Sequence, residues 1–225
     1  MGSRTEIILV EGNSLDQTLE ECYAVQKKFP EKEIQVLVQD GIGKADAVRK
    51  GCQVAKGEAL VLFDADLTVA PEEISRMVEA LVKGEGDLVI GNRFAHPMER
   101  RAMPWINYLG NQIFSRIFTL LIGKPIRDTL CGAKALWKDD YHRIDSHRKE
   151  MGSCDPFGDF DLLLGAKRWN LKILEIPVRY RARRYGDSKI HRFRHGAMLL
   201  KTMVRTSMRL ASSASLESID CHPQG

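Results

Sequence analysis

The chain has 225 residues, of which 44% are hydrophobic and 28% are charged, and its formal net charge is +4 at pH 7. These values are typical of a folded globular chain and exclude a disordered or fibrous protein. The small net charge gives no general case for a nucleic-acid-binding protein, and no apolar run is long enough to span a bilayer.

Five cysteines are spread along the chain, and none of them belongs to a CxxC pair. This spacing excludes the usual zinc and dithiol motifs, and free thiols favour a reducing compartment. The first residues, MGSRTE, contain no apolar signal core. We therefore expect a cytoplasmic protein that is either soluble or peripheral on the inner face of the membrane.

Strands and helices alternate in the first half of the sequence. Apolar or β-branched runs predict the strands, and apolar residues at helical spacing predict the helices. The predicted strands are residues 6–10, 34–38, 59–63 and 87–90, and the predicted helices are residues 16–29, 44–56 and 71–82. Residues 59–63 (ALVLF) are apolar throughout, as expected for a parallel strand that is buried on both faces.

The second half is less regular. The predicted helices are residues 105–122, 160–169 and 198–210, and the predicted strands are residues 133–137 and 171–178. A basic loop is predicted over residues 180–194. We expect an α/β fold with a mainly parallel sheet flanked by helices. Residues 1–210 would form a single domain, and residues 211–225 a polar, disordered tail.

Asp64 and Asp66 follow directly after the buried strand, with Ala65 between them. Ligand sites in open α/β sheets lie beyond the carboxyl ends of the strands. Two hard oxygen donors at such a position suit Mg²⁺ or Mn²⁺, and such an ion neutralises a diphosphate. The alternative interpretation is a polar turn that leads into the next helix.

Two further side chains are expected at the same rim of the sheet. Lys44 follows a glycine-rich turn, DGIG, where the backbone can approach a ligand and a lysine can meet a phosphate. Arg93 follows the strand 87–90, and arginine suits bidentate phosphate contact. The alternative for Arg93 is an ordinary surface arginine.

Two carboxylates stand at the start of the helix predicted over residues 160–169, in the segment DPFGDFD. Asp159 or Asp161 is a candidate general base for an acceptor hydroxyl. The alternative is that they cap the helix or interact with its dipole, which fits any acidic first turn.

Together these residues resemble the family 2 glycosyltransferases of the GT-A fold, in particular the branch of dolichyl- and undecaprenyl-phosphate sugar synthases. The matching segments occur in the family's order and cover most of the chain. They are EIILVEGNSLD (6–16), GKADAVRKG (43–51), LVLFDADLTVAPEE (60–73), DLVIGNRF (87–94), MPWINYLGN (103–111), IRDTLCGAKAL (126–136), FGDFDLLLGA (157–166) and VRYRARRYGDSKIHRFRHG (178–196).

The resemblance implies a role for each matching position. The residues implied to bind a nucleoside-diphosphate sugar are Glu11, Lys44, Asp64, Ala65, Asp66 and Arg93, with the metal on Asp64 and Asp66. The implied bases are Asp159 and Asp161. The residues implied to bind the acceptor or its phosphate are Asp128, Cys131, Gly132, Arg184, Ser188 and Lys189.

The sequence departs from the family at its start. Family members open with a strand of the type VSVVIPAYNE, ahead of the strand that residues 6–10 match, and that strand is central in the sheet. Without it, backbone groups and apolar surface would be exposed. We expect one of three explanations. The chain is a fragment, or a partner chain or another segment completes the sheet, or the nucleotide site is incomplete.

The resemblance implies metal-dependent, inverting transfer of a hexose from a nucleoside-diphosphate sugar to a polyprenyl phosphate or a glycan hydroxyl. Arg93, Arg184 and Lys189 would hold an acceptor phosphate. The basic, partly aromatic residues 180–194 would contact an anionic membrane surface.

Other functions remain as alternatives. One is a nucleotide-sugar-binding remnant without turnover. A second is a basic module in which aromatic side chains stack on nucleic-acid bases. We do not expect nucleic acid as a partner, because the carboxylate-rich rim would repel phosphate without a metal. A third, a nucleotidyltransferase, would need a glycine-rich fingerprint that the sequence lacks.

Overall fold

The computed structural model describes residues 5–99, 102–151, 155, 157–183, 198–201 and 203–204, and of residues 149–151 the backbone alone. Three predicted site residues, Arg184, Ser188 and Lys189, lie outside the described residues. The predicted tail, residues 211–225, and part of the predicted helix 198–210 lie outside them too.

Strands and helices alternate in the first half as the sequence predicts. The elements are β1 (Glu6–Glu11), α1 (Thr18–Lys28), β2 (Glu33–Val38), α2 (Lys44–Val54), β3 (Ala59–Leu62), α3 (Glu73–Val82) and β4 (Leu88–Asn92). The second half continues with α4 (Trp105–Ile122), β5 (Lys134–Trp137), α5 (Lys138–Met151), α6 (Asp159–Arg168) and β6 (Ile173–Pro177). Helix α5 has no counterpart among the predicted elements.

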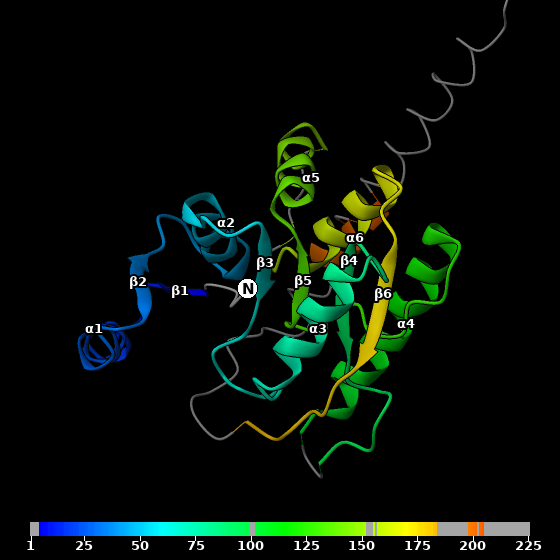
Figure 1. The fold of residues 1–225 in the computed structure, drawn as a ribbon. Helices are drawn as coiled ribbons and strands as arrows, with labels where there is room; N and C mark the ends of the chain where they lie inside the picture. The colour runs from blue at the N-terminus through cyan, green and yellow to red at the C-terminus, as the bar shows by residue number, and fades with distance from the viewer. Residues whose placement is uncertain are drawn as a thin grey trace, which may run out of the picture.

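A four-stranded sheet in the order β3-β5-β4-β6 forms the centre of the molecule (Figure 1). Strand β5 runs antiparallel to both of its neighbours, and β6 runs parallel to β4. Strands β3, β4 and β6 therefore share one direction, and β5 is reversed between them. The carboxyl ends of β3 and β4 consequently lie at the same edge of the sheet, as the site prediction requires.

Strands β1 and β2 pair in parallel with each other and form a separate two-stranded sheet. In Figure 1 they stand to the left of the four central strands, with α1 beyond them. In the described part of the chain, β1 pairs with β2 alone and β3 pairs with β5 alone. In the described residues the strands thus fall into two sheets, with β1 and β3 not paired to each other.

Burial supports the same conclusion. Every residue of β4 is buried, whereas the apolar residues of β1 are half-buried or exposed. Strand β1 is joined to the rest of the molecule by Ile8, which packs against the main core, and by Glu6, whose carboxylate accepts the backbone N–H groups of Lys56 and Gly57 at 2.6 and 2.7 Å.

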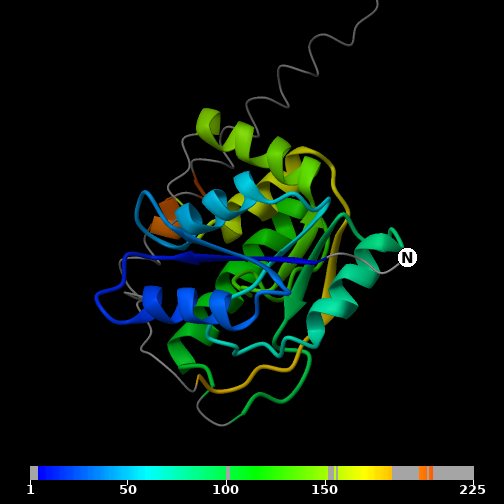
Figure 2. The ribbon, with the colours of Figure 1, turned by 60° about the vertical axis from the view of Figure 1, so that its left-hand side comes forward.

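The core lies on both faces of the four-stranded sheet. Because side chains alternate along a strand, Leu88 and Ile90 of β4 join the cluster under α4, α5 and α6, while Val89 joins the cluster under α3. Figure 2 shows α3 on one side of this sheet and α4 and α6 on the other. Phe160 is fully buried between the rings of Phe114 and Phe118. No helix in the described residues is long and apolar enough to cross a membrane.

Candidate functional site

Lys44 and Asp64 form an ion pair at the carboxyl edge of the sheet. Lys44 begins α2 directly after Gly43, whose φ of 91° suits glycine, and Asp64 follows β3. The Lys44 Nζ lies 2.8 Å from Asp64 Oδ1 and 4.0 Å from Asp159 Oδ2. Burial alone would lower the pKa of Lys44, but Asp159 and Asp64 outweigh it and raise that pKa above its ordinary value. Lys44 is therefore a fixed cation.

The Asp64 carboxylate is held in place by charge and by shape. Its burial would raise its pKa, but Lys44, and more weakly Lys134 and Arg93, lower that pKa below its ordinary value. Gly132 packs directly against Asp64, so that a methyl group at position 132 would overlap the carboxylate. A glycine is required here because the chain approaches Asp64 without room for a side chain. Ala65, the next residue, is exposed.

A buried ion pair between Lys134 and Asp159 lies beneath this rim. The two side chains are nearly inaccessible, and the Lys134 ammonium also donates to the carbonyl of Cys131. Burial raises the pKa of the Cys131 thiol to about 11, so this predicted acceptor-side residue is a neutral thiol at pH 7. Lys134 was not predicted as a site residue. The sequence does contain a signal for Lys134, which is the one charged residue in the otherwise apolar strand AKALW. Because burying a lysine without a partner costs free energy, this pattern indicates a carboxylate close to Lys134.

The start of α6 is fixed by Asp155. Its carboxylate accepts the backbone N–H groups of Phe157, Phe160 and Asp161 at 2.9, 2.7 and 3.3 Å. Burial raises the pKa of Asp155, and these three donors oppose that rise. Asp155 thus has the capping function that the sequence offered as the alternative for the acidic residues nearby. Asp161 lines a pocket between α2, α5 and α6, together with Lys44 and Asp159.

Arg93 and Asp128 form a bidentate pair behind the rim. Arg93 Nε and Nη2 lie 2.7 and 2.8 Å from the two Asp128 oxygens, and the Arg93 backbone N–H donates to Asp128 at 3.0 Å. Burial alone would lower the pKa of Arg93, whereas Asp128 raises it. The guanidinium carbon also lies 5.1 Å from the centre of the Tyr180 ring. Arg93 therefore organises the loop of Asp128, and a phosphate contact by Arg93 stays a prediction.

Asp66 forms an ion pair with Arg183, which belongs to the segment predicted as a basic loop, residues 180–194. Asp66 Oδ1 accepts from the backbone N–H and the hydroxyl of Thr68 at 3.1 and 2.8 Å. Asp66 Oδ2 lies 2.6 Å from Nη2 of Arg183. Leu67, between Asp66 and Thr68, has a φ of 52°, an uncommon conformation for a residue with a Cβ. The two bonds from Thr68 hold this turn.

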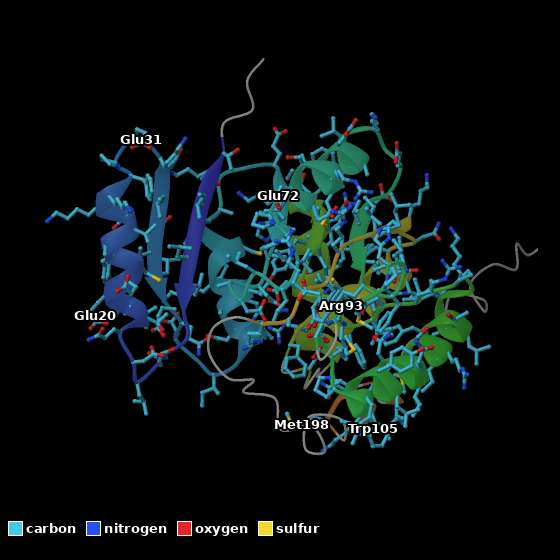
Figure 3. All side chains as sticks on the ribbon, turned by 90° about the horizontal axis from the view of Figure 1, so that it is seen from below. Glu20, Glu31, Glu72, Arg93, Trp105 and Met198 are labelled. Atoms are coloured by element: carbon cyan, nitrogen blue, oxygen red, sulfur yellow. The ribbon has the colours of Figure 1, made fainter. Side chains whose placement is uncertain are left out.

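Glu11 lies at the end of β1, across the division of the sheet. Its carboxylate accepts the backbone N–H groups of Asn13 and Ser14 at 2.9 and 2.7 Å. Burial would raise the pKa of Glu11, but hydrogen bonds with Ser14 and Asn13 lower it. Glu11 thus closes the turn after β1. In Figure 3, β1 and β2 lie on the opposite side of the molecule from α4, with Arg93 between them. Nucleotide contact by Glu11 stays a prediction.

The two carboxylates after β3 fit a divalent ion that binds together with a substrate. Asp64 and Asp66 each already hold a cation of the chain, so both positions attract positive charge. Within the described residues, no group of three or more His, Cys, Asp or Glu side chains could hold a metal by itself. Mg²⁺ usually takes one or two carboxylates, with phosphate oxygens and water completing its shell. The donor set therefore suits an ion shared with a diphosphate.

Known proteins are similar to this chain in sequence. Residues 1–144 match the family model described as Glycosyl transferase family 2. A dolichol-phosphate mannosyltransferase of Pyrococcus furiosus is 29% identical over 194 residues, which are 84% of this chain and 51% of that protein. An undecaprenyl-phosphate 4-deoxy-4-formamido-L-arabinose transferase of Edwardsiella ictaluri is 28% identical, covering 84% of this chain and 54% of the relative. The chain thus spans about half the length of these relatives.

The fold has a solved counterpart. A glucosyl-3-phosphoglycerate synthase of Mycobacterium tuberculosis, in complex with Mn²⁺, uridine diphosphate and phosphoglyceric acid, superimposes with a TM-score of 0.65. The sequence identity is 16%, and the match covers 90% of this chain and 67% of the synthase. The likeness confirms the predicted GT-A fold. Because the family model matches more than half of the sequence, the chain belongs to glycosyl transferase family 2.

Proposed function

We propose that the protein transfers a hexose from a nucleoside-diphosphate sugar to a polyprenyl phosphate, in a metal-dependent reaction with inversion. The observation that carries this proposal is the cluster of Lys44, Asp64 and Asp159 at the edge of the sheet, with Asp66 beside it. The relatives support the acceptor class, because one is a dolichol-phosphate mannosyltransferase and another is an undecaprenyl-phosphate sugar transferase. A glycan hydroxyl is the second candidate acceptor.

On the donor side, Asp64 and Asp66 would hold a Mg²⁺ or Mn²⁺ ion. When bound, the ion would neutralise the charge that develops on the departing nucleoside diphosphate. Lys44 supplies a further fixed positive charge at this place. Gly132 and Lys44 together set the direction of the Asp64 carboxylate before any ligand arrives, so little reorganisation is needed on binding.

On the acceptor side, the pairing of Asp159 favours a phosphate over a hydroxyl. A hydroxyl acceptor needs a base to take its proton, and Asp159 is held in a buried ion pair with Lys134. A phosphate acceptor is already an anion and attacks the anomeric carbon without that step. Arg93, Arg184 and Lys189 would hold its charge, and Asp161 would serve as base in the hydroxyl case.

Replacing Asp66 by alanine is expected to reduce transfer by at least about 100-fold, the scale seen when a group that stabilises transition-state charge is removed. The assay measures release of nucleoside diphosphate from UDP- and GDP-sugars with a polyprenyl phosphate acceptor, with Mn²⁺ and then with EDTA. Asp139→Ala, a change at an exposed carboxylate on α5, is the matched control and should keep wild-type rates. Equal activity in wild type and Asp66→Ala contradicts the proposal.

The divided sheet favours one competing function, a protein that binds the nucleotide sugar without turnover. The expected partner chain or segment would supply the strand between β1 and β3 and complete the sheet. Thermal unfolding with UDP- and GDP-sugars and Mn²⁺ reports binding separately from transfer. Stabilisation of the wild type without product formation would favour the binding protein over the enzyme.

We also propose that the protein associates peripherally with an anionic membrane through α4. Several large apolar side chains on this helix are exposed, although α4 packs its other face on the core; they are Trp105, Tyr108, Leu109, Ile113 and Leu120. Tyr108 stacks edge-on with Phe94, which follows Arg93 in the sequence. An acceptor lipid reached through this face would therefore bring its phosphate toward Arg93.

The double change Leu109→Glu and Ile113→Glu is expected to abolish co-sedimentation with anionic liposomes, because it places two charges on the apolar face. Wild type should pellet with phosphatidylserine vesicles at low salt. Val82→Glu, at an exposed apolar residue on α3, is the control and should pellet like the wild type. A wild type that stays in the supernatant at all salt concentrations contradicts the membrane proposal.

A further inference from the structure

The segment that follows β6 lies along the loop that carries Asp66. Tyr180 forms an antiparallel bridge with Val69, and the Arg181 backbone N–H donates to the carbonyl of Thr68 at 2.8 Å. Arg183 then reaches the second carboxylate of the proposed metal pair. Residues 180–183, here named the β6 extension, thereby carry a guanidinium to Asp66 from 117 positions away in the sequence.

The two oxygens of Asp66 have different partners. Oδ1 is held by the N–H and the hydroxyl of Thr68, which fixes the rotation of the carboxylate. Oδ2 is the oxygen that faces Arg183, at 2.6 Å. A divalent ion that bound Oδ2 would lie beside this guanidinium, and two like charges at such a distance repel each other. Arg183 and a metal ion therefore compete for Asp66.

The pair of Arg183 and Asp66 is accessible enough to separate. The Arg183 side chain is 37% exposed and that of Asp66 is 16% exposed. By contrast, the side chains of Arg93 and Asp128 are 11% and 0% exposed, and they are joined by two parallel hydrogen bonds. Ion pairs near the surface contribute little net free energy, so the contact at Asp66 is weak enough for a ligand to replace it.

We propose that Arg183 is a positioning residue that exchanges partners during donor binding, a proposal that rests on the proposed function. It neutralises Asp66 in the free protein and moves to the diphosphate when the metal ion takes Asp66. A metal ion alone must displace Arg183 without offering it another anion. A metal ion that arrives with a diphosphate supplies that anion, so each ligand strengthens the binding of the other by the same factor.

The test measures Mn²⁺ affinity directly, from the electron paramagnetic resonance signal of free Mn²⁺, with and without UDP or GDP. We expect Arg183→Gln to bind Mn²⁺ alone about two- to fivefold more tightly, the range set by an exposed ion pair. UDP or GDP should increase the Mn²⁺ affinity of the wild type. We expect this increase to be smaller in Arg183→Gln by at least the same two- to fivefold factor. Arg181→Gln is the matched control, because it removes the same charge from an exposed side chain of the β6 extension, and it should keep wild-type values.

Arg183→Lys keeps the charge and is expected to restore most of the coupling, and a thermal unfolding curve for each variant verifies that it folds. Unchanged Mn²⁺ affinity in Arg183→Gln, or an equal gain in Arg181→Gln, overturns the proposal. Failure of the proposed donor site gives a different result, since the wild type would then bind neither UDP nor GDP, and failure of transfer alone shows in the release assay while nucleotide and Mn²⁺ binding remain. Binding of nucleotide and Mn²⁺ without coupling between them overturns the partner exchange alone.

Discussion

Replacing Lys134 by methionine is expected to lower the free energy of unfolding by about 3–5 kcal/mol, the usual cost of removing one partner from a buried ion pair. Lys134 is 2% exposed and Asp159 is 5% exposed. Methionine keeps most of the length and apolar surface of lysine, so the lost ammonium dominates the effect. Asp159 would remain as a buried charge without its partner, and the carbonyl of Cys131 would lose its donor.

Urea denaturation followed by circular dichroism measures this loss. The double variant Lys134→Met with Asp159→Leu should recover much of the stability, because a buried ion pair replaced on both sides by apolar residues is often neutral. Lys83→Met removes an exposed lysine that pairs with Glu79 on α3, and it should change the transition little. If Lys134→Met lowers the free energy of unfolding by less than about 1 kcal/mol, the Lys134–Asp159 pair contributes no more than an exposed ion pair, which contradicts the prediction.

The same variant is expected to weaken nucleotide binding. Lys44 lies 2.8 Å from Asp64 and 4.0 Å from Asp159, so it already stands between the two carboxylates. Without Lys134, Asp159 would attract Lys44 more strongly and draw it away from Asp64. The buried pair thus stabilises the fold and also keeps Lys44 at the rim of the sheet.

Most strands and helices could be predicted because each carries a regular apolar pattern of its own, although α1 buries none of its residues fully. Helix α5 could not, since its sequence, KDDYHRIDSHRKEM, is strongly polar. It buries Tyr141 and Ile144, and Ile144 packs against Gly165 of α6. Two apolar residues three positions apart are too few to show a helical period. The helix is therefore stabilised by its contact with α6, which no local pattern reveals.

The site was predicted in part for a similar reason. The carboxyl edge of the sheet collects the residues after each strand, which placed Lys44 and Asp64 together. The partners of the other charged residues are not fixed by this rule. Asp159 pairs with Lys134 from 25 positions away, and Asp66 with Arg183 from 117 positions away. Such pairs depend on the positions of β5 and β6 in the sheet, and no local pattern in the sequence predicts this strand order.

Replacing Asp128 by alanine is expected to cost about 3–5 kcal/mol of stability, because it leaves the Arg93 guanidinium largely buried without its carboxylate. Asp128 is 1% exposed and accepts both guanidinium and backbone hydrogen bonds from Arg93. Asp128→Asn keeps the shape and loses the charge, so it should cost less than Asp128→Ala. Urea denaturation of both variants separates the loss of charge from the loss of shape.

Asp145→Asn provides the comparison, since Asp145 pairs with Arg148 one turn away on α5 at 3.0 Å, where both side chains are 20% exposed. This change should cost no more than about 1 kcal/mol. If Asp128→Ala costs as little as Asp145→Asn, the Arg93 pair does not organise the loop. If the prediction holds, burial and the number of hydrogen bonds together decide the effect, because the buried Asp128 accepts three hydrogen bonds from Arg93 and the half-buried Asp145 accepts one from Arg148.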